Sequence, residues 1–171
     1  MQIKQIFPCT ISSLRSVSCE IESVIFVFIL RGISLGGYYD GRWHHVCIFW
    51  RNKDGSWKLF VDDVIIDSGS NFQTGHVIKG GGVTIVGQHQ GLLPGEPSGF
   101  QHSQGFVGRI SGMNLWDFIV PQQEILRMSQ TCGVGIGNVL QWLDFETKYH
   151  GDVILENPSS CQAPNAKHWS E

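Results

Sequence analysis

The sequence predicts an all-β fold, a sandwich or barrel of antiparallel strands that carries one short helix. Glycine accounts for 21 of the 171 residues and charged residues for 16%, whereas average globular proteins have about 7% glycine and about 25% charged residues. From residue 40 onward, short β-prone runs alternate with turn signals. This spacing is typical of a sandwich or barrel and argues against a helical bundle.

Length and hydrophobicity predict a single domain. A chain of 171 residues, 42% of them hydrophobic, is long enough to bury a core. We expect an unassigned N-terminal segment over residues 1–18, one domain over residues 19–163 and a polar tail over residues 164–171.

Charge and hydropathy argue against two kinds of partner. A formal net charge of -3 and a pI near 6.1 provide no cationic field for nucleic acid or anionic lipid. The longest apolar run, residues 24–30, reads as a buried strand and is much shorter than the roughly 20 residues of a membrane-spanning helix. We therefore expect no nucleic-acid partner and no membrane insertion by this segment. The N-terminal residues show no signal-peptide pattern.

Two consecutive hairpins are predicted in the first half of the β-rich region. Asp40-Gly41 precedes a strand over residues 43–50, and Asp54-Gly55 turns the chain into a second strand over residues 57–61. Asp62-Asp63 then separates KLFV from VIID, and aspartate tolerates the positive φ that a two-residue hairpin turn demands.

Three further strands and a long loop are expected after the hairpins. The strands cover residues 83–86, 106–116 and 138–145, and the loop covers residues 87–105. Because loops longer than about 12 to 15 residues in compact domains are usually functional or disordered, the long loop is the first place to look for a site.

A single helix is predicted over residues 121–130. Pro121 occupies the favoured first position, and Ile125, Leu126 and Met128 supply an apolar face. Val120 offers no side-chain oxygen, so no side-chain N-cap is expected.

The five cysteines lack metal-ligand spacing, which argues against zinc. We expect two disulfides and one remaining thiol. Disulfides indicate an oxidising compartment, although the chain shows no signal sequence. Both observations are satisfied if the chain is a fragment or variant of a longer secreted or receptor protein.

Four sequence blocks in order, over residues 22–161, resemble the pentraxin family. They are DGRWHHVCIFW, GGVTIVGQ, FVGRISGMNLWD and NVLQWLDF. The resemblance implies a concanavalin-like, jelly-roll antiparallel β-sandwich, so residues 19–163 would form a partial pentraxin-like domain that is N-terminally truncated or variant. It also implies a secreted protein or an adhesion-receptor ectodomain, and a homo-oligomer as one assembly.

The family signature runs His, any, Cys, any, Ser or Thr, Trp. His45, Cys47 and Trp50 match it, and Phe49 is the departure. We interpret these residues as packing residues, and we expect His44 and His45 to be half-buried in the strand.

Disulfide pairing is implied by the same resemblance. The signature Cys47 pairs in the family with an upstream cysteine, which here is Cys19 or Cys9, and Cys19 is the preferred partner. A second bridge would join Cys132 and Cys161, which leaves Cys9 as the free thiol.

Calcium is the cofactor that the resemblance implies, and this sequence departs from the family's ligands. The family positions fall on His89, Gln90, Gly91, Gln101 and Gln104. An imidazole and a hydrogen thus replace two carboxylates, and Glu96 is a further candidate as a substitute ligand. Because calcium prefers six to eight oxygens, several from carboxylates, weak or absent binding is expected.

No enzymatic motif is present, and we expect a protein without catalytic activity. Glycoside hydrolases need two carboxylates flanking the scissile bond. Asp62, Asp63 and Asp67 bracket a predicted turn, while Asp144 and Glu146 lie at a strand end. The sequence also lacks the GxSxG and GxxxxGK[ST] motifs.

The leading hypothesis is an extracellular, non-enzymatic recognition or adhesion module with a pentraxin-like scaffold and a degraded calcium site, binding a protein or glycan. Three alternatives are a calcium-dependent soluble pentraxin for phosphorylated head groups or glycans, a truncated isoform without independent function, and a concanavalin-like glycoside hydrolase.

Overall fold

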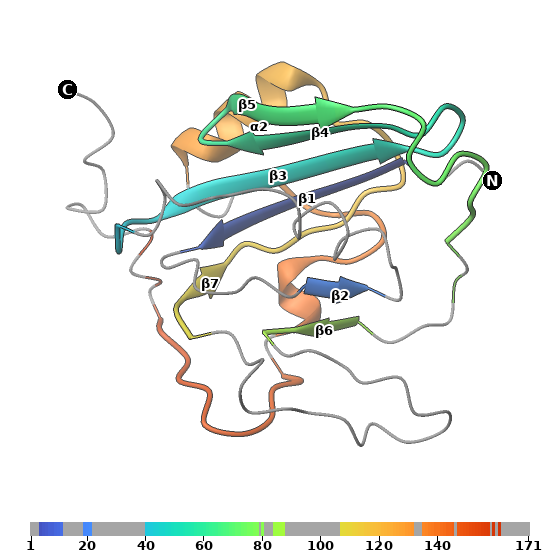
Figure 1. Cartoon of the computed structure of the whole chain (residues 1–171). Coiled ribbons are helices and arrows are strands. Elements are labelled where there is room, and N and C mark those ends of the chain that lie inside the picture. The colour runs from blue at the N-terminus through green and yellow to red at the C-terminus, as the bar shows by residue number, and fades with distance from the viewer. Residues whose placement is uncertain are drawn as a thin grey trace.

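The computed structural model describes residues 4–11, 19–21, 40–78, 80, 84–87, 107–131, 135–145, 147–157, 159 and 161. These residues form two antiparallel sheets and one short α-helix (Figure 1). The larger sheet has the strand order β5-β4-β3-β1-β7. Its strands are β1 (Lys4–Ile11), β3 (His44–Arg51), β4 (Ser56–Val61), β5 (Val64–Gly69) and β7 (Ile110–Ser111). The smaller sheet pairs β2 (Cys19–Ile21) with β6 (Thr84–Val86).

Both predicted hairpins are confirmed. Strand β3 pairs with β4 so that Trp50 lies opposite Trp57, and β4 pairs with β5. Gly55 takes φ +62° in the first turn, and Asp62 and Asp63 take φ 50° and 68° in the second. Two consecutive positive φ angles are the requirement of a type I′ hairpin turn.

Strand β1 lies inside the segment that the sequence left unassigned. It runs antiparallel to β3 along its full length, with Phe7 opposite Ile48 and Cys9 opposite Val46. Pro8 lacks a backbone N–H and is unfavourable in the middle of a sheet. Strand β7 pairs with Thr10 and Ile11, beyond the proline, so the missing donor does not interrupt that ladder.

The predicted helix is confirmed as α2 (Gln122–Gln130), with Pro121 at the N-cap and no side-chain capping bond. It lies behind β4 and β5 in the view of Figure 1. Ile125 and Met128 are buried, but the expected contribution of Leu126 is wrong because this side chain is 38% exposed. One hydrophobic cluster joins the helix to the sheet, and its buried members are Cys47, Phe60, Trp116, Val120, Ile125 and Met128.

The prediction of one long strand over residues 106–116 is largely wrong for the residues of this range that the structure describes. The described residues in this range form only the two-residue strand β7 and an isolated bridge from Leu115 to Leu140. Side-chain bonds take the place of a regular ladder: the Asn114 Oδ1 accepts the Gly137 N–H at 3.0 Å.

The strand predicted over residues 138–145 is also wrong. Its centre is the 3₁₀ helix η3 (Trp142–Asp144). The Asp144 carboxylate accepts the backbone N–H of Gln141 at 2.9 Å, and the Asp144 N–H donates to the Gln141 carbonyl at 2.9 Å. This reciprocal cap favours a helical turn over an extended strand.

Three predicted segments fall outside the described residues: the apolar run 24–30, the polar tail over residues 164–171 and, apart from Gly87, the long loop over residues 87–105. Within the described ranges, no helix has the length and apolar character needed to cross a membrane.

Candidate functional site

The predicted calcium positions lie outside the described residues. His89, Gln90, Gly91, Gln101 and Gln104, and the substitute ligand Glu96, all belong to the undescribed range 88–106. In the part of the chain that the structure describes, no group of three or more His, Cys, Asp or Glu side chains is arranged to hold a metal ion. The family calcium site therefore stays a prediction on sequence.

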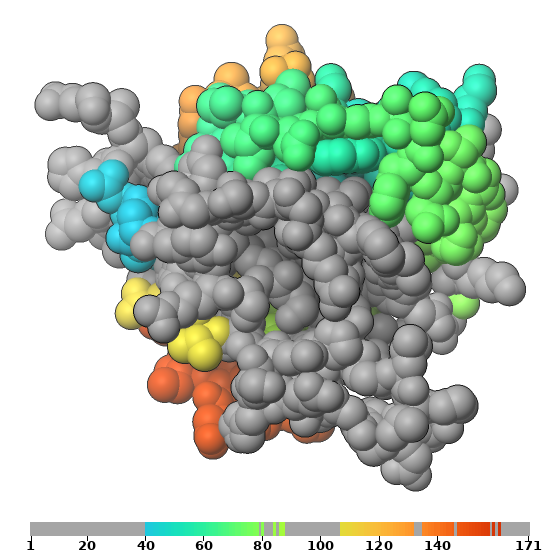
Figure 2. All heavy atoms as spheres, in the orientation of Figure 1, coloured from blue at the N-terminus to red at the C-terminus, as the bar shows by residue number. Residues whose placement is uncertain are grey.

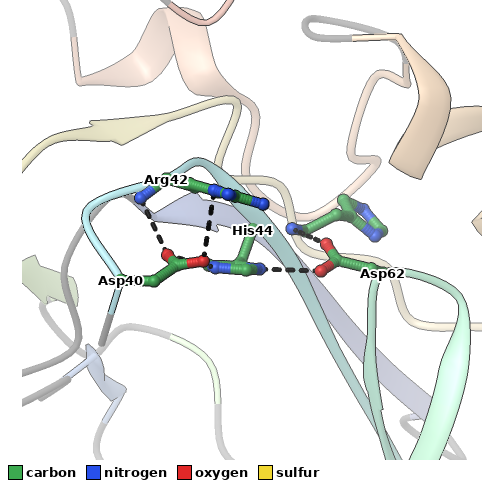
Figure 3. Close-up of polar contacts among 5 residues, drawn as sticks. Asp40, Arg42, His44 and Asp62 are labelled. Carbon is green, nitrogen blue, oxygen red and sulfur yellow. Dashed lines mark hydrogen bonds and ion pairs between the residues drawn. The ribbon is translucent and has the colours of Figure 1, made fainter. Parts of the chain in front are cut away.

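A cluster of four polar side chains lies where β3 begins, and we call it the Asp40–Asp62 cluster (Figure 3). Asp40 and Arg42 belong to the turn before β3, His44 is the first residue of β3, and Asp62 lies in the turn between β4 and β5. Antiparallel pairing of β3 with β4 brings the β4–β5 turn beside the start of β3. The hairpins that the sequence predicts thus position all four residues.

His44 lies between two carboxylates. Its Nδ1 is 2.7 Å from an Asp62 oxygen and its Nε2 is 2.9 Å from an Asp40 oxygen. The hydrogen bond to Asp62 is the main cause that raises the pKa of His44, the bond to Asp40 acts in the same direction, and burial opposes both. The same contact with His44 lowers the pKa of Asp40. The ring is only 8% exposed, so both contacts are shielded from bulk water.

Asp62 joins the β4–β5 turn to β3 by two further bonds. Its second carboxylate oxygen accepts the backbone N–H of His45 at 2.8 Å, and its own N–H donates to the His45 carbonyl at 2.9 Å. These bonds fix the position of the Asp62 carboxylate. They also hold the Asp62 backbone at a φ of 50°, which is unusual for a residue other than glycine.

His45 is the neighbour of His44 and has the opposite environment. It is 2% exposed, and neither ring nitrogen has a hydrogen-bond partner in the structure. Burial lowers the pKa of His45 to about 4, so its ring is neutral at physiological pH. The expectation that both histidines are half-buried is wrong, because His44 is also only 6% exposed.

Cys47 corrects the predicted disulfide pairing. In the structure it is a free thiol with no exposed surface, so the expected Cys19–Cys47 bridge is not formed. Burial raises the pKa of this thiol, which keeps it protonated. Strand pairing explains the difference: Cys47 lies opposite Pro8 of β1, whereas Cys19 pairs with Val86 in the other sheet.

The second predicted bridge is tested only at one end. Cys161 is disulfide-bonded. Cys132 lies outside the described residues, as does the side chain of Cys9, so the Cys132–Cys161 pairing and the free Cys9 thiol stay predictions.

Other described carboxylates make local structural contacts. The Asp54 carboxylate forms an ion pair with the Arg51 guanidinium and accepts the N–H of Ser56 at 3.0 Å. Asp67 accepts the N–H of Ser68 at 2.8 Å. These contacts stabilise turns and strand ends, which is the structural interpretation given to the turn aspartates in the sequence.

Comparison with known proteins identifies the class of this scaffold. The model of the pentaxin family matches residues 31–157. The chain is 40% identical over 123 residues to "Neuronal pentraxin-2" of Mus musculus, which is 72% of this chain and 28% of that protein. It is 38% identical over 122 residues to "Sushi, von Willebrand factor type A, EGF and pentraxin domain-containing protein 1" of Rattus norvegicus, which is 70% of this chain and 3% of that protein.

The fold agrees with this family. A SAP-like heptameric pentraxin from Limulus polyphemus superposes with a TM-score of 0.55 at 21% identity, covering 84% of this chain and 76% of that chain. The chain belongs to the pentaxin family. It spans a small part, 28% and 3%, of the two relatives named above.

Proposed function

We propose that this chain is an extracellular, non-enzymatic recognition module that binds a protein or glycan through the loop face of a pentraxin scaffold, with weak calcium binding or none. The observation that carries the proposal is the loss of carboxylates at the family's calcium positions. Between residues 87 and 108, Glu96 is the single carboxylate in the sequence.

Charge balance explains why this loss matters. Calcium takes six to eight oxygen ligands, and its affinity rises with the number of charged ligands. At the family positions, the oxygen ligands that this sequence can still offer are neutral side-chain amides and one backbone carbonyl. A calcium ion held without carboxylates would keep its charge uncompensated, so occupancy at millimolar calcium is not expected.

Two features of the described residues support a non-enzymatic role. The aspartates of the turns, Asp40, Asp54 and Asp62, are engaged by neighbouring side chains or backbone N–H groups. Asp144, one of the five carboxylates considered for glycoside hydrolysis, caps η3. A catalytic pair requires two carboxyl groups that face a substrate across a gap.

The second candidate is a calcium-dependent pentraxin for phosphorylated head groups or glycans. Family membership favours it, since pentraxins typically bind calcium. The similar Limulus polyphemus protein is a heptamer, and a ring of copies would be the corresponding assembly of this chain. A truncated isoform without independent function and a glycoside hydrolase are further outcomes of the test below.

The test compares the protein with a variant that restores the family's carboxylates. The double substitution His89→Glu with Gly91→Asp restores the two carboxylates that the family has on either side of the position of Gln90. Binding to immobilised phosphocholine and to a glycan array is measured in millimolar calcium and in EDTA. If the ligand is a glycan, we expect the unmodified chain to bind it equally well in calcium and in EDTA. Only the variant should bind phosphocholine, and only in calcium. Phosphocholine capture by the unmodified chain in calcium would contradict the proposal, and release of sugars from β-glucans would establish the hydrolase.

A further inference from the structure

The Asp40–Asp62 cluster joins two turns that are distant in sequence. The turn that begins at Asp40 is exposed at the surface, where it is drawn in cyan in Figure 2, and Asp40, Gly41 and Arg42 are all exposed. The second turn connects β4 and β5 and contains Asp62. The His44 ring contacts both turns, with nitrogen-to-oxygen distances of 2.9 Å to Asp40 and 2.7 Å to Asp62.

Hydrogen-bond geometry sets the protonation state of this ring. A neutral imidazole has one donor and one acceptor nitrogen, whereas an imidazolium has two donors. Ionised carboxylates only accept hydrogen bonds. Since both His44 nitrogens lie within hydrogen-bond distance of carboxylate oxygens, the two contacts form together only when the cluster holds one more proton, either on the ring or on one of the two carboxyl groups.

We propose that His44 is a proton-dependent latch, which in its imidazolium form holds the Asp40 turn against the β4–β5 turn and on deprotonation releases the Asp40 turn. Of the two carboxyl groups, Asp40 is disfavoured as the proton carrier because its contact with His44 lowers its pKa. The raised pKa of His44 agrees with the geometric assignment.

The identity of the released turn follows from the remaining bonds. Asp62 keeps two backbone bonds to His45, at 2.8 and 2.9 Å, whatever the charge of His44. A neutral His44 ring therefore donates its one N–H to the fixed Asp62 carboxylate, and its hydrogen bond to Asp40 is lost. Asp40 then retains the exposed Arg42, whose Nε is 3.6 Å away and whose N–H donates at 2.9 Å.

The charged and titratable groups of the cluster set the direction of the pH response. Among the described residues around the His44 ring, they are Asp40 and Arg42 from its own turn, Asp62 from the β4–β5 turn and the adjacent His45. Both carboxylates favour the protonated ring. The latch is therefore closed while the pH is below the pKa of His44 in the folded protein and opens as the pH rises through that pKa.

The direct test is an NMR titration of the full chain labelled with ¹⁵N at the histidine rings. In the unmodified protein we expect both His44 nitrogens to show imidazolium shifts at pH 6.5 and a transition at higher pH. The backbone amide of Arg42 should shift with the same midpoint, because its acceptor Asp40 loses its contact with the His44 ring in that transition. A neutral His44 ring at pH 6.5, or an Arg42 amide that does not follow the His44 midpoint, would overturn the proposal.

Two asparagine substitutions sharpen the test. Asp62→Asn preserves tolerance of positive φ and lets the amide donate to Nδ1, so a neutral His44 ring can satisfy both neighbours. We expect the His44 midpoint to move to lower pH and the Arg42 amide to stop titrating. Asp63→Asn is the matched control in the same turn and should leave both midpoints unchanged. Equal midpoints in the two variants would contradict the latch, and the titration of the unmodified protein decides the matter if Asp62→Asn does not fold.

Discussion

His44 and His45 are consecutive residues of β3 whose rings have opposite environments. The His44 ring lies between the carboxylates of Asp40 and Asp62, and the His45 ring is buried without a hydrogen-bond partner. Alternation along a strand sends consecutive side chains to opposite faces of the sheet, so the two rings do not share these contacts. The folded protein therefore favours a proton on His44 and disfavours one on His45.

The substitution His45→Leu should reduce the acid sensitivity of the fold. The pKa of His45 is lowered from 6.5 to about 4, so the unfolded chain binds a proton that the folded chain does not. Its contribution to stability is present above pH 6.5 and is lost as the pH falls towards 4. The unmodified protein should therefore lose up to about 3 kcal/mol more unfolding free energy between pH 7.5 and pH 4 than the His45→Leu variant does.

Urea unfolding of both proteins at pH 7.5, 5.5 and 4 measures this difference. The matched comparison is His76→Leu, at an exposed position of a described loop. A stability difference between His45→Leu and the unmodified protein that stays constant over this pH range would contradict the burial of a neutral His45.

Cys47 should be alkylated only after unfolding. Its thiol has no exposed surface and a raised pKa, so iodoacetamide should not modify it in the native protein. In denaturant without a reducing agent, complete modification is expected because the thiol is free. Peptide mass spectrometry of the two samples provides the readout, and Cys161 is the disulfide-bonded control that should stay unmodified in both. If Cys47 reacts only after reduction, it is part of a disulfide, and mapping of the non-reduced peptides would show whether its partner is Cys19 or Cys9.

Gly55→Ala should be more destabilising than Gly75→Ala. Both glycines have positive φ, 62° and 80°, which costs a substituted alanine roughly 1–2 kcal/mol. A Cβ at Gly55 would also lie 2.3 Å from the backbone nitrogen of Phe72, whereas nothing lies within 4 Å of a Cβ at Gly75. We expect an additional loss of about 1–3 kcal/mol for Gly55→Ala, the usual cost of overpacking.

Thermal or urea unfolding of the two variants compares these costs directly. The clash matters because the Gly55 carbonyl accepts the Phe72 N–H at 3.0 Å and the Phe72 carbonyl accepts the Trp50 Nε1–H at 2.8 Å. The clash at Gly55 should therefore also weaken the hydrogen bond that holds the side chain of the buried Trp50. Equal stability of the two variants would show that this segment adapts freely.

Local chemistry made the hairpins and the helix predictable. The Asp54-Gly55 and Asp62-Asp63 turns supply the positive φ angles that the β3–β4–β5 meander needs, and Pro121 marks the start of α2. These signals depend on neighbouring residues alone, so sequence reading could use them.

Features that depend on distant contacts were missed. The strand propensity of residues 138–145 yields to a distant contact, the Asn114 bond to Gly137, and also to the local Asp144 cap on Gln141, which the sequence reading overlooked. The Asp40–Asp62 cluster unites residues 22 positions apart, and only the register of β3 with β4 brings them together. The HH pair gave no signal of its own, because burial of both rings depends on the whole sheet.

The proposed loss of calcium binding is tested most directly by the melting temperature of the oxidised protein in millimolar calcium and in EDTA. A ligand at 100 times its dissociation constant adds about 2.7 kcal/mol to folding stability, which corresponds to roughly 5–10 °C for a chain of this size. The neutral residues at the family positions predict the same melting temperature in both buffers. A rise of several degrees in calcium would contradict this account and would make the chain a calcium-binding pentraxin.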